Sequence, residues 1–172
     1  AYDIASCLVG SEMCIRDSVK QEFIIEKDIM EKIGWGKFLA EGVREWVFKT
    51  NNRKITQFNI INSWIVRQFQ NEYNPSHWHG GHVSGVGYLK VPKNLGETSQ
   101  NNKTMNHNGK LEMVHGSKAF LCKPTFRVTP RVGDFYFFPH YLMHAVYPFS
   151  QCDDERRSVS FNATVDQSLF NE

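Results

Sequence analysis

The sequence has few cysteines, no long apolar run and no strong excess of charge of either sign. Its four cysteines among 172 residues form no CxxC pair and are too sparse for a disulfide framework or a thiolate zinc site. No apolar stretch approaches the roughly 20 residues of a membrane-spanning helix, and the amino end lacks the pattern of a secretory signal. These absences predict a soluble, cytoplasmic protein with no membrane partner.

Basic residues are also too few to form a nucleic-acid surface. The chain has 20 Lys and Arg against 18 Asp and Glu, a net charge of +2, and no basic stripe that could follow a phosphate backbone. Nucleic acid is therefore disfavoured as a partner. A hydrophobic content of 41% is enough for the core of one domain, while the oligomeric state stays open.

The first eighteen residues differ from the rest. The stretch CLVGSEMCIRDS (7–18) resembles translated sequencing-adapter read-through. We therefore expect 1–18 to be a non-native leader and 19–172 to be a single domain whose native amino end is missing. A genuine leader is the alternative.

The rest of the chain contains one amphipathic helical pattern and many short strand patterns. Apolar residues recur every three or four positions at 37–49, and Asn51-Asn52 follows as a stop. Gly, Pro and Asn separate the strand patterns, which favours an all-β fold with a minor amino-terminal helix, a cupin-like jelly roll or double-stranded β-helix. The strands are expected at 61–70, 83–91, 110–115, 119–122, 125–130, 133–139, 142–149 and 156–165.

The polar, Asn-rich stretch 92–110 is too long for an ordinary connection. It is interpreted as either a lid over a substrate or a plain insertion. Large apolar residues elsewhere are expected in the core: Trp64, Phe120, Phe126, Phe135, Phe137, Val146 and Phe161.

Three histidines fall within six positions in NPSHWHGGHVSG (74–85). Alternate residues of a strand share one face, so His77 and His79 are expected to point the same way. Two such histidines alone more often have a structural role. His144, on a later strand, changes this balance, because three imidazoles on one face can bind iron and leave positions open. His140 is expected at the surface or behind the ligands.

A second candidate site follows in RRSVSFN (156–162). Alternation puts Arg156, Ser158, Ser160 and Asn162 on one polar face, which should look into the barrel. A guanidinium suits planar, bidentate binding of a carboxylate. Arg156 with Ser158 is therefore predicted to be a carboxylate clamp; arginines at the surface of an edge strand are the alternative.

Three blocks of the sequence together resemble a known family. NEYNPSHWHGGHVSGVGYLKVP, VTPRVGDFYFFPHYLMHAVYPF and DERRSVSFNA are similar to blocks of the 2-oxoglutarate- and Fe(II)-dependent oxygenases, in a small subfamily common among phage and marine bacteria. The resemblance runs from about Ser63 to Val165. It implies a double-stranded β-helix, iron held by His77, His79 and His144, and an Arg-x-Ser for 2-oxoglutarate at Arg156 and Ser158. Tyr88 could also contact the cosubstrate through its hydroxyl group.

One departure from the family concerns the ligands. Most such oxygenases supply a carboxylate to iron, and none occurs between Pro75 and Tyr88. His79 takes its place, with His82 as the alternative ligand. His79-Gly80-Gly81 can also be read as the H-x-G of enzymes that leave a coordination slot for halide.

The resemblance implies a dioxygenase that uses Fe(II), 2-oxoglutarate and O2, hydroxylates an unidentified small molecule or peptide, and releases succinate and CO2. No protein residue beyond the metal centre is expected to be catalytic. Two other readings stay open: a three-histidine cupin dioxygenase that needs no 2-oxoglutarate, and a non-catalytic jelly-roll binding or virion module. The predicted clamp at Arg156 favours the first reading.

Overall fold

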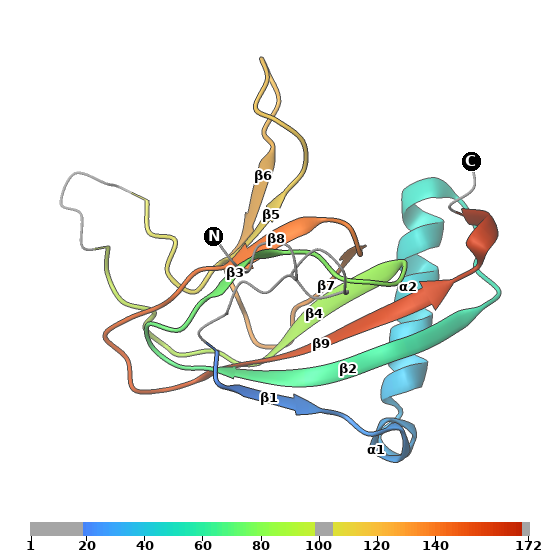
Figure 1. Cartoon of the computed structure of the whole chain (residues 1–172), viewed down its shortest axis with the longest axis horizontal. Helices are drawn as coiled ribbons and strands as arrows, with labels where there is room; N and C mark the ends of the chain where they lie inside the picture. The colour runs from blue at the N-terminus through green and yellow to red at the C-terminus, as the bar shows by residue number, and fades with distance from the viewer. Residues whose placement is uncertain (1–18, 99–104, 170–172) are drawn as a thin grey trace, which may run out of the picture.

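The computed structural model describes residues 19–98 and 105–169, whose strands form two sheets (Figure 1). The predicted leader therefore lies outside the described residues. No helix within them is both long and apolar enough to cross a membrane. In chain order the elements are β1 (Gln21–Ile24), α1 (Lys27–Lys32), α2 (Trp35–Asn51), β2 (Phe58–Gln68), β3 (Asn74–His77), β4 (Val83–Lys90), β5 (Leu111–Val114), β6 (Thr125–Val128), β7 (Phe135–Pro139), β8 (Met143–Val146), β9 (Arg156–Val165) and the 3-10 helix Gln167–Leu169.

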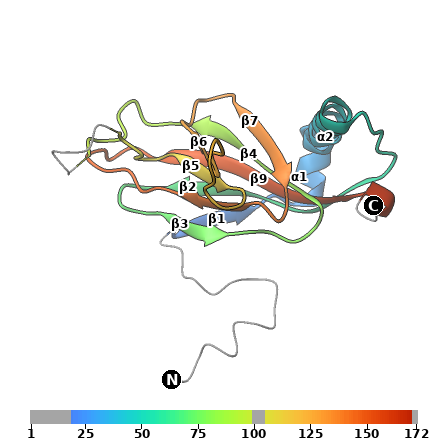
Figure 2. The ribbon, with the colours of Figure 1, turned by 90° about the horizontal axis from the view of Figure 1, so that it is seen from above.

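The two sheets give the jelly-roll arrangement expected from the strand patterns. One sheet has the order β1-β2-β9-β4-β7 and the other β3-β8-β5-β6. Every strand pair is antiparallel. A cavity lies between the sheets. Helix α2 packs on the outer side of the five-stranded sheet (Figures 1 and 2).

Helix α2 confirms the helix expected at 37–49. Leu39, Val43 and Val47 share one buried face of this helix, as apolar residues at a spacing of four do. They pack against residues of β4 and β9 that point away from the cavity, including Val83 and Phe161. At the carboxyl end the backbone of Asn52 is left-handed, with φ 56°, a conformation that Asn tolerates better than most residues. The helix thus covers the back of the sheet that carries the site.

The middle of the five-stranded sheet has an unbroken register over the residues that face the cavity. We call sets of cross-strand neighbours on this face rows one to four, and successive rows are about 6.7 Å apart along the strands. The rows are, in order, Gln68–Arg156; Val66–Ser158–Tyr88; Trp64–Ser160–Val86; and Asn62–Asn162–Ser84.

Several elements depart from the sequence predictions. The strand expected at 119–122 is reduced to a single bridge between Ala119 and Cys122, inside a tight turn. Strand β1 and helix α1 were not expected. Both are short, so their apolar residues show no clear period. The described parts of 92–110 contain no helix or strand, in agreement with a long irregular loop.

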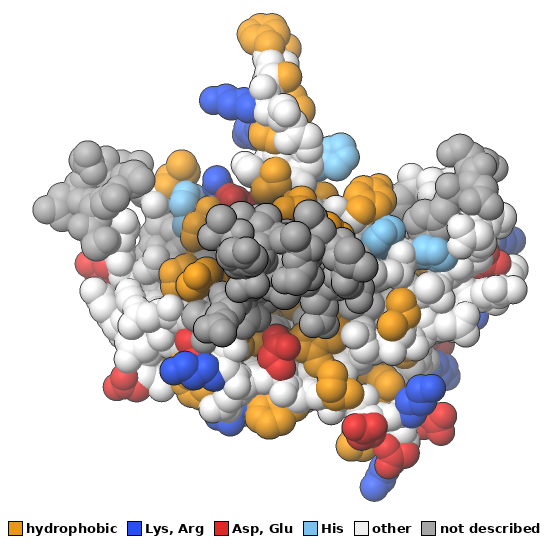
Figure 3. All heavy atoms as spheres, viewed as in Figure 1, with side chains coloured by type: hydrophobic (Ala, Val, Ile, Leu, Met, Phe, Trp, Pro, Cys, Tyr) orange, Lys and Arg blue, Asp and Glu red, His pale blue; other side chains and the backbone are white. Residues whose placement is uncertain are grey.

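Two predicted core residues are at the surface instead. Phe120 is 92% exposed and Phe126 is 63% exposed. Both belong to the β5–β6 hairpin, which projects from the body of the molecule in Figure 1 and carries hydrophobic side chains at its end in Figure 3. No described residue of the opposite sheet covers this end. The prediction was wrong because apolar composition does not reveal how far a hairpin extends beyond its neighbours.

Four of the other five predicted core residues lie in or against the core. Phe161 is fully buried, Phe135 and Phe137 pack against the same cluster, and Val146 packs between the sheets. Trp64 is only partly buried and lines the cavity. Its position therefore relates to the site rather than to the core.

Candidate metal and cosubstrate site

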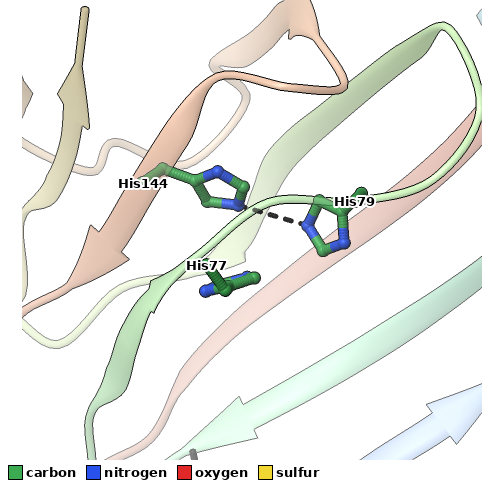
Figure 4. Close-up of side chains that lie close together, drawn as sticks. All are labelled: His77, His79 and His144. Carbon is green, nitrogen blue, oxygen red and sulfur yellow. Dashed lines mark hydrogen bonds between the residues drawn. The ribbon is translucent and has the colours of Figure 1, made fainter. Parts of the chain in front are cut away.

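Three imidazoles meet at one end of the cavity (Figure 4). One ring nitrogen each from His77, His79 and His144 lies within 4.8 Å of the others. The Nε2 atoms of His79 and His144 are 3.2 Å apart. Two nitrogens bound to one metal at about 2.1 Å and at a right angle lie about 3 Å apart, so this spacing suits a shared metal ion.

The backbone fixes which nitrogen of two rings faces the cluster. Nδ1 of His77 is 2.6 Å from the carbonyl oxygen of Pro75, and Nδ1 of His144 is 2.7 Å from that of Leu142. A carbonyl oxygen only accepts, so each Nδ1 carries the proton and donates it. Nε2 then keeps its lone pair for a metal, which is the arrangement usual for metal-binding histidines.

Burial keeps two of the three rings uncharged. It lowers the pKa of His79 to about 3, with the neighbouring imidazoles adding to the effect. Burial and then the proximity of His77 lower the pKa of His144 to about 4, while its hydrogen bond to the Leu142 carbonyl acts in the opposite direction. Both rings are therefore neutral at physiological pH, the form in which imidazole binds metals.

His79 reaches the cluster by a different route from the one expected. Strand β3 ends at His77, so the two histidines do not share a regular strand. The amide of His79 instead donates to the carbonyl of His140, 3.0 Å away in the β7–β8 turn. At Gly81, φ is 98° and a Cβ would lie 2.8 Å from the Ala163 carbonyl oxygen, so glycine permits the turn that follows.

His82, the alternative ligand, lies outside this group of three. Its Nδ1 accepts a hydrogen bond from the backbone N–H of Val165 at 3.1 Å. The ring thus packs against the end of β9. The ring centroid of His82 lies 6.5 Å from that of half-buried His140.

The cavity has a volume of about 560 Å³, within the usual range for ligand sites, and has a closed end and an open end. At the closed end, in rows one and two, Gln68, Arg156, Ser158 and Tyr88 are each at most 3% exposed. At the open end, beyond row three, Ile61 and Trp78 are both 53% exposed. His79 contacts the Trp64 ring of row three, and His144 contacts Phe138, which pairs with Ser84 of row four. The histidines therefore lie toward the open end.

Arg156 is a buried cation without a carboxylate partner among residues 19–98 and 105–169. Nη1 donates to the Gly109 carbonyl at 3.0 Å, and Nε has no hydrogen-bond partner. The guanidinium carbon lies 5.8 Å from the centre of the Tyr88 ring. Burial lowers the pKa of Arg156, but an arginine stays charged in proteins.

The neighbouring arginine shows how the chain neutralises a charge when no ligand is involved. Arg157 points to the other face of β9 and pairs with Glu155, which also pairs with Arg67. An uncompensated buried charge costs several kcal/mol. The contrast indicates that Arg156 is kept for an anion that enters the cavity.

Tyr88 and Ser158 complete the closed end. Burial raises the pKa of Tyr88 to about 12, so the phenol keeps its proton and can donate. Ser158 pairs with Tyr88 across β4 and β9, which puts both hydroxyl-bearing side chains in row two beside Arg156. The three imidazoles and this donor set fit a divalent metal with a dicarboxylate between the two ends.

Residues 62–162 match the sequence profile of the family described as "Putative 2OG-Fe(II) oxygenase". This is more than half of the chain, and the chain belongs to this family. It is a 2-oxoglutarate- and Fe(II)-dependent oxygenase, an oxidoreductase whose cofactors are Fe(II) and 2-oxoglutarate, with O2. No curated protein matches the chain in sequence.

Several solved structures share this fold. The Pseudomonas putida prolyl-4-hydroxylase is 16% identical with a TM-score of 0.53, over 88% of this chain and 74% of its own. The viral collagen prolyl hydroxylase of Paramecium Bursaria Chlorella virus-1, in its 2OG complex, is 15% identical with a TM-score of 0.53, over 87% and 81%. Iron-bound HygX from Streptomyces hygroscopicus is 11% identical with a TM-score of 0.56, over 84% and 71%. These similarities confirm the double-stranded β-helix fold.

The structure adds site residues that the sequence did not single out. Gln68 and Trp64 line the cavity from β2, and the Gly109 carbonyl, at the end of the 92–110 loop, holds Arg156. Asn162 was expected on the inward face but received no role. Alternation along β2 could have indicated Gln68 and Trp64, whereas the contact of Gly109 depends on a loop path that no pattern encodes.

Proposed function

We propose that this oxygenase hydroxylates an organic substrate, with Fe(II) held by His77, His79 and His144. Arg156, Ser158 and Tyr88 would hold the distal carboxylate of 2-oxoglutarate. The substrate is a small molecule or a peptide segment. The single observation that supports this assignment best is the buried, unpaired guanidinium of Arg156 in the cavity that also contains the three imidazoles.

The overall reaction is balanced without a protein acid or base. Bound in this site, Fe(II) would supply the activation of O2 and 2-oxoglutarate would supply two electrons, so that one oxygen atom would enter succinate and the other would convert substrate C–H into C–OH, with release of CO2. No carboxylate belongs to the histidine cluster of the described chain. A neutral ligand set leaves the full metal charge to attract the cosubstrate dianion.

The protein's own residues bind, orient and exclude water. Arg156 and the two hydroxyls of row two fix one end of the cosubstrate, which sets the direction in which its other end points. The hydrogen bonds of His77 and His144 to backbone carbonyls hold the rings ready for metal. Buried Leu111 and Phe138 form part of the cavity wall and keep water from the metal.

Succinate release tests the proposal. Wild-type protein with Fe(II), 2-oxoglutarate and O2 should release succinate even without a substrate, at a slow background rate. His77→Ala and His144→Ala should abolish this release, whereas His115→Ala, on the β5–β6 hairpin, should not. Wild-type-like activity in either cluster variant would remove the assignment.

The 2-oxoglutarate-independent reading makes a different prediction for the same samples. It requires O2 consumption with an organic substrate alone and no effect of Arg156→Ala. Loss of O2 consumption when 2-oxoglutarate is omitted would exclude it.

A further inference from the structure

The open end of the cavity has more apolar walls than the closed end, and these walls limit the kinds of substrate that can bind there. Row three and the neighbouring rim supply apolar walls at this end, from Ile24, Ile61, Trp64 and Trp78. The polar side chains that reach the cavity from row four are Asn62 and Asn162. A substrate that fits these walls carries one polar group on an otherwise apolar body.

Asn162 is oriented toward a ligand by its neighbour. The Ser84 hydroxyl donates to Oδ1 of Asn162 at 2.7 Å, and both residues are buried. This bond occupies the amide oxygen, and because Asn162 lines the cavity its NH2 group is the part of the amide left to donate to a ligand. A donor in this position calls for a carbonyl oxygen on the substrate.

Asn62 lies directly opposite Asn162 across the β2–β9 ladder and is exposed at the mouth. Its amide offers both a donor and an acceptor. Two amides side by side match the adjacent C=O and N–H groups of a substrate amide. A sugar would instead present a hydroxyl on nearly every carbon, and the apolar walls would leave most of these unpaired.

The charges at the cavity exclude an anionic substrate. Among the described residues that line it, Arg156 is the one Lys or Arg, and the proposed function assigns it to the cosubstrate. Glu22, the remaining lining residue with a formal charge, is acidic. A substrate carboxylate or phosphate would thus lose its hydration without gaining a cationic side chain.

From these observations we infer that the open end binds an uncharged, amide-bearing substrate with an apolar body, anchored by Asn162 and Asn62 against Trp64. The inference rests on the proposed function. A free N-acylated amino acid amide and a segment of a polypeptide share this chemistry. Asn162 acts as a positioning residue, because its row adjoins Phe138, which contacts the metal-binding ring of His144.

The test uses matched probes that differ in charge. Wild-type protein with Fe(II), 2-oxoglutarate and O2 is given N-acetyl methylamides of leucine, proline and phenylalanine, the corresponding free N-acetyl acids, a blocked pentapeptide and a methyl glucoside. Succinate above background and the gain of one oxygen atom by the probe are measured. We expect an amide to exceed its free acid by tenfold or more in kcat/KM. Preference for the pentapeptide would identify a polypeptide as the source.

Variants test whether Asn162 is responsible for the preference for amide probes. Asn162→Leu should raise the KM for the best amide probe by roughly ten- to a hundredfold, the value of a lost buried hydrogen bond. Asn59→Ala, at an exposed position of the neighbouring strand β2 that does not line the cavity, should leave this KM unchanged. Asn162→Leu with a wild-type KM would overturn the role of this residue.

The outcomes separate this inference from the proposed function. Absence of any 2-oxoglutarate-dependent succinate contradicts the proposed function itself. Background succinate that no amide increases, or that the acids or the glucoside increase at least as well as the amides, contradicts the inference alone.

Discussion

The side chains of Gln68 and Arg156 lie directly opposite each other across the β2–β9 ladder, and each keeps one buried polar atom without a hydrogen-bond partner in the described chain. Nε2 of Gln68 donates to the carbonyls of Glu72 and Tyr147, at 2.5 and 3.4 Å. This fixes Oε1 as the unpaired atom. The closed end of the cavity therefore combines an unpaired acceptor and an unpaired donor on adjacent strands.

Gln68→Glu should place a carboxylate beside Arg156 that competes with 2-oxoglutarate for the guanidinium. The new carboxylate can pair with Arg156 and neutralise it, so the KM for 2-oxoglutarate should rise by roughly ten- to a hundredfold. Gln68→Met serves as the control, since it alters the same position without adding charge. Equal KM values for the two variants, measured by succinate release, would show that Gln68 does not face the guanidinium.

Arg156→Met should make the cofactor-free protein more stable and at the same time weaken its binding of 2-oxoglutarate. The variant removes a buried charge that has no partner in the described chain and replaces it with an apolar side chain of similar length. The cofactor-free protein should gain about 1–3 kcal/mol in its free energy of unfolding, while 2-oxoglutarate no longer raises its Tm. Denaturant unfolding measures the first effect, and thermal melts with and without 2-oxoglutarate measure the second. A less stable variant would indicate that Arg156 serves the fold.

The metal-free protein should lose stability as the pH falls from about 6.5 to about 4. Folding lowers the pKa of His79 to about 3 and that of His144 to about 4, so over this range the unfolded chain binds more protons than the folded one. Each histidine then lowers the free energy of unfolding by roughly 1 kcal/mol per pH unit. Denaturation at pH 7, 6 and 5 measures the slope. It should be smaller in His144→Leu, and a flat wild-type profile would contradict buried, neutral imidazoles.

Two phenylalanines should differ sharply in their effect on stability. Phe161→Ala removes a fully buried ring and should cost about 3–5 kcal/mol. Phe120→Ala, at the exposed end of the hairpin, should change stability by less than about 0.5 kcal/mol. Urea denaturation of both variants provides the measurement. A large loss in Phe120→Ala would mean that another part of the protein covers the hairpin.

The sequence predicted those features that depend on local periodicity. The 3.6-residue period predicted α2, and the alternation along 156–165 correctly put Arg156, Ser158, Ser160 and Asn162 toward the cavity. The convergence of His77 and His144 was anticipated because both belong to strands, and the structure pairs them directly across β3 and β8.

Features that depend on contacts between distant segments were not predictable. The position of His79 depends on a hydrogen bond to the β7–β8 turn, and the importance of Gln68 depends on its register against β9. The exposure of Phe120 and Phe126 depends on how far one hairpin extends beyond the opposite sheet. Each is set by tertiary geometry, which no local pattern of residues encodes.

Anaerobic titration of the protein with Fe(II) and 2-oxoglutarate tests the central claim most directly, because chelation of iron by the 2-oxo acid gives a visible charge-transfer band. The account predicts one Fe(II) per chain, a band that His144→Ala abolishes, and a band in Arg156→Ala that needs roughly ten- to a hundredfold more 2-oxoglutarate. A wild-type protein that forms no band, or an Arg156→Ala titration that coincides with the wild-type curve, would contradict it.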